Sequence, residues 1–300
     1  MNRQLSALML RLIAALVMAS AGAAAADTAR ELRVCAAPNN LPFSNQRLEG
    51  FENKIAEIIA ADMNASLRYT WHPQQRGFIR NTLKAKACDL VMGVPAGYDL
   101  VLPTKPYYSA SYVFVYRKNR QIDLQSFDDP SLRELRIGLH AFGADGANSP
   151  PAHALARRGI VSNVVGFTIL DTEDSPPGKI IDAVAVGDID VAIVWGPFAG
   201  YFAQQQSVEL AVVPVHATAP GTDRVALPFT FDIAMGVRRD DAAFKAQIEG
   251  ILERKRSDIQ KVLDAYGVPR VSALPADPVA LNLWSHTPAA IAMTDQRQGE

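Results

Sequence analysis

The 300-residue sequence has only two cysteines and no marked excess of charge of either sign. Two cysteines cannot build a disulfide-dense miniprotein or a zinc or iron–sulfur site that needs four thiolates. A net charge of −1 does not suggest a nucleic-acid partner, which would favour a strongly basic face. Apolar residues make up 49% of the chain and charged residues 20%, a globular composition that excludes a disordered or fibrous chain.

Motifs of the common enzyme classes are also missing. The sequence has no H-E-x-x-H motif, no nucleophile elbow and no Walker A loop. The acidic run at residues 171–174 offers oxygen ligands to a hard cation, but it lacks EF-hand spacing, and a solvated acidic loop is the favoured alternative. We expect no catalytic activity, no metal and no cofactor; if the scaffold were an enzyme, His140 and Asp145 would be the titratable candidates.

The first 26 residues have the pattern of a secretory signal peptide. Arg3 and Arg11 are positive, residues 12–19 are apolar, and an Ala-x-Ala cleavage site ends at Ala26. The apolar run is short for a segment that crosses a hydrocarbon layer of about 30 Å, and no later segment is apolar enough. We therefore expect cleavage and a location in the periplasm, without membrane insertion of the mature chain.

Export to an oxidising compartment favours a disulfide between Cys35 and Cys88. Cys35 lies in one apolar run and Cys88 directly precedes another, so the sulfurs could meet if these runs form neighbouring strands. The bridge would stabilise the fold by about 4 kcal/mol in the chain-entropy model. The alternative is two buried free thiols.

Strand and helix patterns alternate along the chain and predict an α/β fold. In a first series, we expect strands at residues 32–36, 67–71, 90–94 and 112–116 and helices at residues 51–63 and 78–87. In a second series, we expect strands at residues 135–139, 191–195, 210–215 and 231–237 and helices from about residue 152 and at residues 177–186, 197–205, 241–252 and 258–266. The last part of the chain is expected to re-enter the first series.

Three motifs resemble those of amino-acid-type solute-binding proteins of the periplasm. They are Leu41-Pro42-Phe43-Ser44 with Gly50-Phe51-Glu52, then Pro106-Tyr107-Tyr108, and then residues 187–192. The resemblance implies the two-lobed type II periplasmic binding protein fold, an α/β fold with two lobes joined by a two-segment hinge. We expect lobe 1 at residues 27–117 and 231–270, lobe 2 at residues 118–230, and a carboxyl-terminal tail at residues 271–300.

The sequence departs from the amino-acid binders at both charges that hold a zwitterion. Residues 95–102 contain no arginine for an α-carboxylate, and Trp195 stands where an acid would bind the α-amino group. A buried charge needs a partner, so a free amino acid would be held poorly.

A closer resemblance is to the MoxJ/XoxJ type of binding-protein homologue, over about residues 32–270. The similar blocks are residues 35–45, 73–83, 88–99, 171–178 and 195–203. This family accompanies periplasmic methanol dehydrogenases that contain pyrroloquinoline quinone (PQQ) and calcium or a lanthanide. The resemblance implies an accessory role in assembly or activation, with the apo dehydrogenase as partner. We favour the lanthanide-linked branch and expect a monomer.

In the binding-protein geometry, loops at strand ends line the cleft between the lobes. The residues expected there are mostly aromatic and nearly uncharged: Phe43, Ser44, Trp71, Arg76, Phe78, Tyr98, Tyr107 and Tyr108 from lobe 1, and His140, Phe142, Trp195, Phe198 and Tyr201 from lobe 2. Such a surface could hold an apolar segment or helix of a partner. The alternative for each ring is a place in the core. The alternative function is a transporter receptor for a small apolar or aromatic solute.

Arg76 and Arg80 lie four residues apart in the helix expected at residues 78–87 and its approach, a spacing that places side chains on one helix face. They could pair carboxylates of a partner or of PQQ. Surface pairing with local acids is the favoured alternative and contributes little stability.

Overall fold

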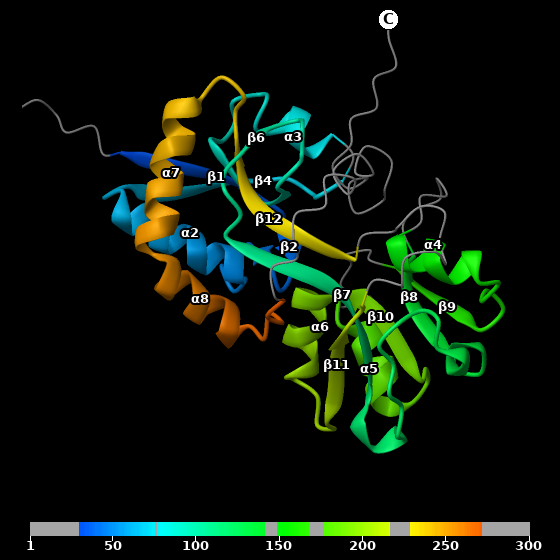
Figure 1. The fold of residues 1–300 in the computed structure, drawn as a ribbon. Coiled ribbons are helices and arrows are strands. Elements are labelled where there is room, and N and C mark those ends of the chain that lie inside the picture. The colour runs from blue at the N-terminus through cyan, green and yellow to red at the C-terminus, as the bar shows by residue number, and fades with distance from the viewer. Residues whose placement is uncertain (1–29, 76, 142–148, 169–176, 217–228, 272–300) are drawn as a thin grey trace, which may run out of the picture.

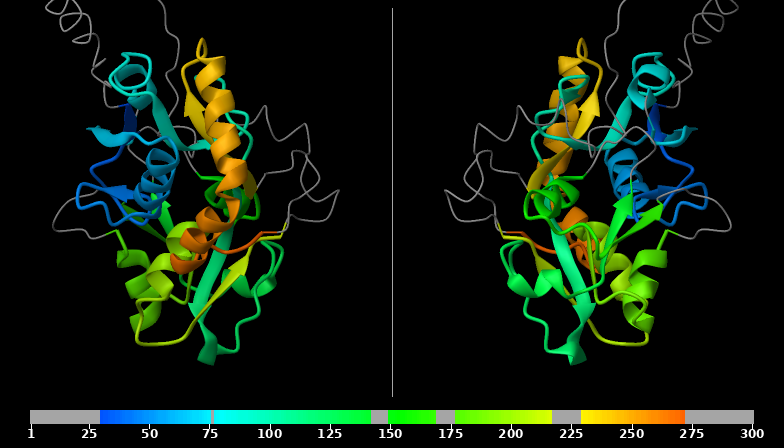
Figure 2. Two further views of the ribbon diagram at one scale, coloured as in Figure 1. Left: turned by 90° about the vertical axis from the view of Figure 1, so that its left-hand side faces the viewer. Right: turned by 90° about the vertical axis from the view of Figure 1, so that its right-hand side faces the viewer.

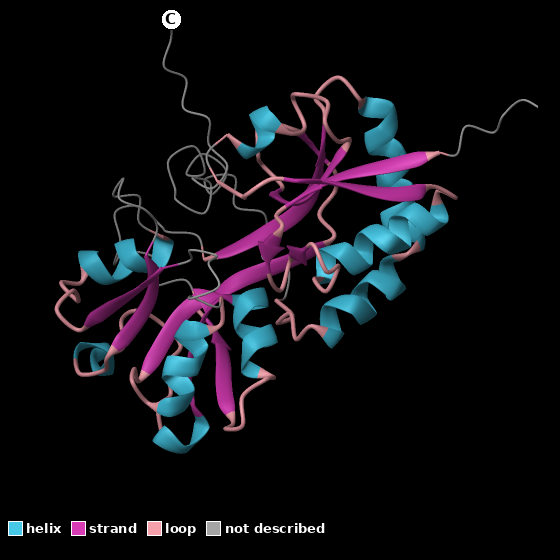
Figure 3. Ribbon diagram, turned by 180° about the vertical axis from the view of Figure 1, so that it is seen from behind, coloured by secondary structure: helices cyan, strands magenta, loops and turns pink. Residues whose placement is uncertain are grey.

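The computed structural model describes residues 30–75, 77–141, 149–168, 177–216 and 229–271. They form two α/β lobes that are joined by two strands, β7 (Tyr108–Arg117) and β12 (Thr230–Val237), as Figure 1 shows. The predicted signal peptide lies outside the described residues, as does the predicted tail beyond residue 271. Seen from behind, strands run through the middle of both lobes and helices lie outside them (Figure 3).

The first lobe is built on strands in the order β4-β1-β5-β12. Strand β1 (Glu31–Ala36) pairs in parallel with β4 (Ser66–Trp71) and β5 (Leu90–Pro95), and β12 is antiparallel to β5. The lobe also contains α2 (Phe51–Asp62), α3 (Phe78–Asn81), α7 (Ala242–Arg254), α8 (Arg256–Ala265) and the short strands β2 (Asn39–Asn40), β3 (Ser44–Asn45) and β6 (Leu102–Pro103). Because β12 follows the second lobe in sequence, the predicted re-entry of the chain is confirmed.

The second lobe is built around the other half of β7. Strand β8 (Ile137–Ala141) pairs in parallel with β9 (Val164–Thr168) and β10 (Val191–Trp195), and β10 and β11 (Leu210–Pro214) both pair antiparallel with β7. Its helices are α4 (Pro150–Arg157), α5 (Lys179–Val186) and α6 (Gly196–Ala203), with short 3₁₀ turns at η1 (Lys118–Arg120) and η2 (Pro130–Arg133). Ser149 caps α4, and the helix begins at Pro150 with two prolines, close to the start predicted near residue 152.

Strand β7 belongs to both lobes. Residues 108–111 pair with residues 230–233 of β12, whereas Tyr112 and the following residues pair with β10 and β11. Two hydrophobic cores lie on either side of this change of partner, and Tyr107 and Tyr108 pack against both of them. The lobe boundaries proposed above, at residues 117 and 231, stay a prediction.

Helix α2 shows why the first lobe folds as its sequence pattern indicates. Phe51, Ile55 and Ile59 recur on one helix face, and all three are fully buried. The side chain of Asn53 accepts hydrogen bonds from the backbone N–H groups of Gly50 and Asn45, each at 3.1 Å. These bonds fix the start of the helix and the loop before it.

Cys35 and Cys88 form the predicted disulfide. Their Cα atoms lie 5.5 Å apart, and the two residues belong to one buried cluster between β1 and β5. The two apolar runs form β1 and β5, which are neighbouring strands as predicted and pair in parallel at Val34 and Cys35.

Two expectations about local structure are wrong. The helix predicted at residues 78–87 is only the four-residue α3, because Thr82 leaves helical geometry and Lys86 takes a positive φ of 59°. Strand β9 was not predicted, since Gly166 interrupts its apolar pattern. None of the helices described has both the length and the apolar character that a membrane crossing requires.

Candidate functional site

Aromatic rings form a continuous series from one lobe to the other. We call it the junction aromatic cluster, and it comprises Phe43, Phe51, Tyr107, Tyr108, His140, Phe198, Tyr201, Phe202 and Tyr266. Neighbouring ring centroids lie between 4.7 Å and 6.0 Å apart, a range in which aromatic pairs attract one another. The series therefore brings together six residues that the sequence predicts for the cleft.

The lobe 1 part of the cluster is centred on Phe51 at the start of α2. Its ring lies 5.3 Å from Phe43, 6.0 Å from Tyr108 and 6.0 Å from Tyr266. Tyr107 packs edge-on against Tyr108 at 4.8 Å. Phe51 is fully buried, whereas Phe43, Tyr107 and Tyr108 are partly buried. The buried ring thus holds the accessible ones in place.

Tyr266 connects the lobes. It follows α8 and stacks on Tyr201 of α6, with ring centroids 5.7 Å apart and ring planes 15° apart. Figure 2 shows α7 and α8 running in succession along lobe 1, with α8 ending beside lobe 2. The contact is close because Gly200 lies against the backbone of Gly267, where a β carbon would collide with the Gly267 carbonyl. Gly200 therefore allows a close approach of the two backbones.

On the lobe 2 side, aromatic residues of α6 continue the cluster. Tyr201, Phe202 and Phe198 contact one another in series, and Phe198 meets the His140 ring at 4.8 Å. Burial lowers the pKa of His140 to about 4, so its imidazole is neutral near neutral pH. His140 therefore adds an uncharged ring to this end of the cluster.

Trp195 lies beside the cluster at the end of β10. Its ring contacts Tyr112 at 5.3 Å and Phe231 at 5.8 Å, and it packs against the same core as Tyr107 and Tyr108. Tyr112 is on β7 and Phe231 on β12, so the tryptophan lies against both connecting strands. It occupies the place where an amino-acid binder is expected to have an acid.

Glu52 is the residue that sequence reasoning missed. Its carboxyl group lies over Gly93 of β5, where a β carbon would collide with Oε1. Burial raises its pKa to about 8, and its charge would also act on the hydroxyls of Tyr69, Tyr107 and Tyr108. The Gly50-Phe51-Glu52 motif was a signal for this residue, but the motif could not show its burial. Near neutral pH the carboxyl is mostly protonated, so this wall of the site is uncharged.

The other predicted cleft residues have different surroundings. Phe78 and Tyr98 are only 2% and 3% exposed, inside the cluster around the disulfide. Ser44 is buried and donates its hydroxyl to the Ala37 carbonyl at 2.9 Å. Trp71 is partly buried and stacks on Tyr69 with centroids 4.7 Å apart. Phe78 and Tyr98 therefore belong to the core around the disulfide.

Several predicted residues lie outside the described residues: Arg76, Phe142, Asp145 and the acidic run at 171–174. Helix α3 spans Phe78–Asn81 and includes Arg80, and the shared face predicted for Arg76 and Arg80 stays a prediction. Across the described part of the chain, no three His, Cys, Asp or Glu side chains gather in a group that could hold a metal ion.

Comparisons with known proteins cover both lobes. The sequence model of the bacterial extracellular solute-binding proteins, family 3, matches residues 32–268. Protein MoxJ of Methylorubrum extorquens is 32% identical over 260 residues, which are 83% of this chain and 84% of MoxJ. The crystal structure of periplasmic binding protein XoxJ from Methylobacterium extorquens AM1 is 36% identical, with a TM-score of 0.65, over 81% of this chain and 100% of XoxJ. That of MxaJ from Methlophaga aminisulfidivorans MPT is 28% identical, with a TM-score of 0.71, over 80% of this chain and 100% of MxaJ. The matched region includes the whole junction aromatic cluster.

Proposed function

Because the chain belongs to the bacterial extracellular solute-binding proteins of family 3, and among them to the homologues of MoxJ and XoxJ, we propose that it is a periplasmic accessory protein of methanol oxidation. In this role it binds the apo form of a PQQ-dependent methanol dehydrogenase of the lanthanide-linked type and assists its assembly or activation. The PQQ and the metal belong to the dehydrogenase, and the accessory protein itself needs no cofactor.

The junction aromatic cluster is the observation that supports this proposal most. Its partly buried rings, together with Trp195, come from both lobes and from the segment after α8. Large rings held in place by packing lose little conformational freedom on binding, and they often contribute most of the energy of a protein interface. An apolar segment of the dehydrogenase is the occupant that we propose.

The charge state of the region supports a macromolecular partner over a free amino acid. Glu52 and His140 are both mostly uncharged near neutral pH, because burial raises the pKa of the acid to about 8 and lowers that of the imidazole to about 4. Trp195 replaces the acid that would bind an α-amino group. Glu52, His140 and Trp195 therefore offer a zwitterion no charge that would compensate the loss of its hydration.

Calorimetric titration with purified methanol dehydrogenase tests the proposed surface. Trp195→Ala and Tyr201→Ala should each weaken binding by about tenfold, because each removes a large ring from the interface. Val186→Ala is the control, since Val186 lies on α5 and is 71% exposed outside the cluster. Equal affinity for all three variants would contradict the proposed surface. If the dehydrogenase gives no heat and a small apolar or aromatic solute raises Tm, a transporter receptor is the better assignment.

A further inference from the structure

A hollow of about 280 Å³ lies on lobe 1, apart from the junction aromatic cluster. Four cationic residues line it: Lys84 and Lys86 from the turn after α3, and Arg238 and Arg239 from the turn before α7. Leu83 and Leu100 add apolar surface, and Asp240 is its one acidic residue. We call it the cationic hollow. Its excess of positive charge contrasts with the net charge of −1 of the whole chain.

The two lysines of the cationic hollow have no acidic partner among the residues that the structure describes. Both are exposed, and neither forms an ion pair with any residue that the structure describes. Arg239 donates Nη1 to the backbone carbonyl of Asp99 at 2.9 Å, which leaves its charge uncompensated. Only Arg238 is neutralised, by Asp89 at 2.9 Å and Asp241 at 3.3 Å. The side chains of Lys84, Lys86 and Arg239 are therefore exposed around one depression, together with the single carboxylate of Asp240.

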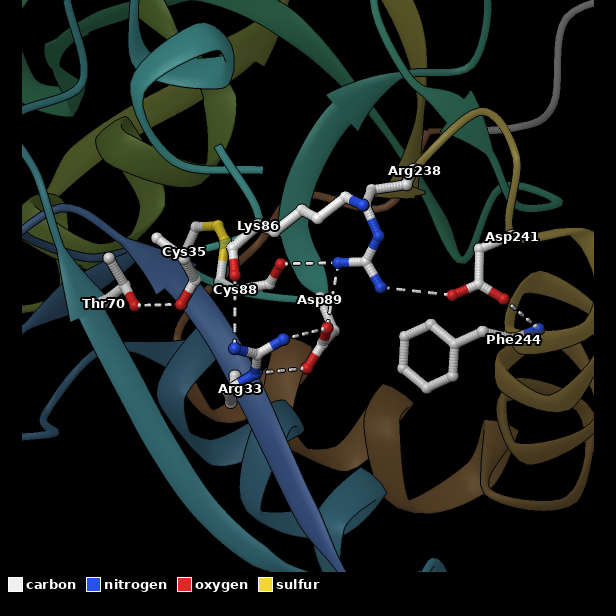
Figure 4. A network of polar contacts seen from close by, with 10 residues as sticks. Arg33, Cys35, Thr70, Lys86, Cys88, Asp89, Arg238, Asp241 and Phe244 are labelled. Carbon is white, nitrogen blue, oxygen red and sulfur yellow. Dashed lines mark hydrogen bonds and ion pairs between the residues drawn. A yellow bond between two sulfur atoms is a disulfide. The ribbon is translucent and has the colours of Figure 1, made fainter. Parts of the chain in front are cut away.

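The turn that carries the lysines is held by bonds to three successive backbone carbonyls (Figure 4). The Lys86 carbonyl accepts from Arg33 Nη1 at 3.2 Å, that of Ala87 from Thr70 Oγ1 at 2.7 Å, and that of Cys88 from Arg238 Nη1 at 2.8 Å. The Cys35–Cys88 disulfide adds a covalent link to β1 directly after the turn. These four constraints, together with the burial of Leu83 in the cluster around the disulfide, fix the turn.

Asp89 links the two sides of this arrangement. Its carboxylate accepts two bonds from Arg33, at 2.7 Å and 2.8 Å, and one from Arg238 at 2.9 Å (Figure 4). Burial disfavours the charged form of Asp89, but these bonds outweigh it and hold its pKa below the usual value. The carboxylate consequently stays ionised and joins the lysine turn to the arginine turn.

Lys86 has a left-handed backbone conformation, with a φ of 59°. A residue with a β carbon adopts this conformation at a cost of about 1 kcal/mol, and such conformations are maintained where surrounding contacts enforce them. The bonds around Lys86 provide that enforcement. A glycine would fit the turn more easily but would remove a positive charge from the hollow.

We propose that the cationic hollow is a docking site for a short acidic segment of a protein partner. Glutamate side chains suit this lining, because their carboxylates can pair with Lys84, Lys86 and Arg239 while their methylene groups contact the partly buried Leu100. The concave shape favours a protein segment over the flat surface of an anionic membrane. The fixed turn reduces the conformational entropy that is lost on binding. This site is separate from the junction aromatic cluster, so it does not depend on the function proposed for that cluster.

NMR titration of the ¹⁵N-labelled protein with hexaglutamate, at an ionic strength of about 0.1 M, tests the proposal. The expected result is saturable shifts at residues 83–86 and 238–240, with no shifts from neutral hexaglutamine. The double variant Lys84→Gln with Lys86→Gln should bind hexaglutamate about tenfold more weakly, because two charge-assisted contacts are lost. Glutamine preserves the β carbon at residue 86, so the backbone preference of the turn is unchanged.

The control is the double variant Lys105→Gln with Lys179→Gln, which removes the same charge from two exposed lysines outside the hollow. Its affinity should stay within about twofold of the parent value, since distant surface charges are screened. An equal loss in both double variants would mean a general charge effect and would overturn the proposal. So would shifts produced by inorganic phosphate or by phosphatidylglycerol vesicles at residues 83–86 without any from hexaglutamate.

Discussion

At the scale of single residues, the junction contains two titratable side chains whose pKa values are shifted in opposite senses. Burial raises the pKa of Glu52 to about 8 and lowers that of His140 to about 4. Both shifts favour the uncharged form, because each group loses hydration without gaining a partner of opposite charge. The two residues therefore make opposite contributions to the pH dependence of folding.

Glu52→Gln should stabilise the protein progressively as pH rises. The carboxyl has a higher pKa folded than unfolded, so its stabilising contribution is complete below about pH 4.5 and is lost as pH rises through 8. Glutamine cannot ionise and escapes this loss. Urea unfolding should show that the stability of the variant relative to the parent is about 4 kcal/mol higher at pH 8.5 than at pH 5, because each pH unit between the two pKa values changes the difference by about 1.4 kcal/mol. A difference that is the same at both pH values would show that Glu52 is not buried as described.

His140→Phe should reduce the loss of stability on acidification. The folded pKa of about 4 lies below the unfolded value of 6.5, so the contribution of His140 is present above pH 6.5 and is lost as pH falls toward 4. Phenylalanine keeps a ring against Phe198 and does not titrate. The free energy of unfolding of the variant should therefore fall less between pH 7 and pH 5 than that of the parent. Parallel pH curves for the two proteins would contradict a buried neutral imidazole.

Sequence reasoning predicted residue types in the site better than it predicted their environments. The aromatic character of the junction was visible, but Phe78 and Tyr98 were grouped with it although they lie in the core near the disulfide. Apolar patterns do not distinguish a ring that faces an interface from one that faces a core. Tyr266 was missed as a junction residue because it was treated only as the end of a helix.

At the scale of elements, close contact between α6 and the segment after α8 joins the two lobes. Gly200 faces the Gly267 backbone, and a β carbon at Gly196 would lie 2.7 Å from the Ser111 carbonyl on β7. Helix α6 therefore packs closely against β7 and against the segment after α8 through its glycines. The sequence could suggest close approach at these glycines, but it could not identify the segment that approaches.

Gly200→Ala should destabilise the protein by about 2 kcal/mol, because the new methyl group forces α6 away from the Gly267 backbone. Gly250→Ala is the matched control, since Gly250 lies inside α7 and only the flexible side chain of Arg254 is near it. That change should stabilise by about 0.5 kcal/mol through helix propensity. Denaturant unfolding measures both values, and equal effects of the two substitutions would contradict the close contact.

Loss of the disulfide should lower the free energy of unfolding by about 4 kcal/mol, because the bridge closes a long loop in the unfolded chain. The two cysteines are 53 residues apart in sequence. Urea unfolding of the variant Cys35→Ala with Cys88→Ala checks this value. Unchanged stability in that variant and in the reduced parent protein would show that the bridge does not constrain the chain.

The elements that the sequence predicted correctly have strong periodic patterns, as in α2 and β10. The helix predicted at residues 78–87 is shorter than expected for two reasons. Thr82 ends α3 early, since its hydroxyl bonds to the Phe78 carbonyl at 2.6 Å and its backbone departs from helical angles. The turn that follows gains its shape from Arg33, Thr70 and Arg238, which lie far away in sequence, so no local pattern could reveal it.

At the scale of the whole molecule, two α/β lobes share one long strand, and an aromatic series passes between them at the side of α8. Binding-protein lobes connected by two strands can move relative to each other, but here Tyr266 and Gly267 also contact α6. The junction is therefore a packed surface as well as a hinge. This arrangement suits the binding of a partner segment by residues of both lobes.

The most direct test of the proposed function is calorimetric titration of the mature protein with the apo and holo forms of one lanthanide-linked methanol dehydrogenase. If the protein assists assembly or activation, we expect saturable binding that is at least about tenfold tighter for the apo form, a difference of about 1.4 kcal/mol. The preference should disappear in Tyr201→Ala and persist in Val186→Ala. Equal affinity for both forms, or no binding to either, would contradict a role in assembly or activation.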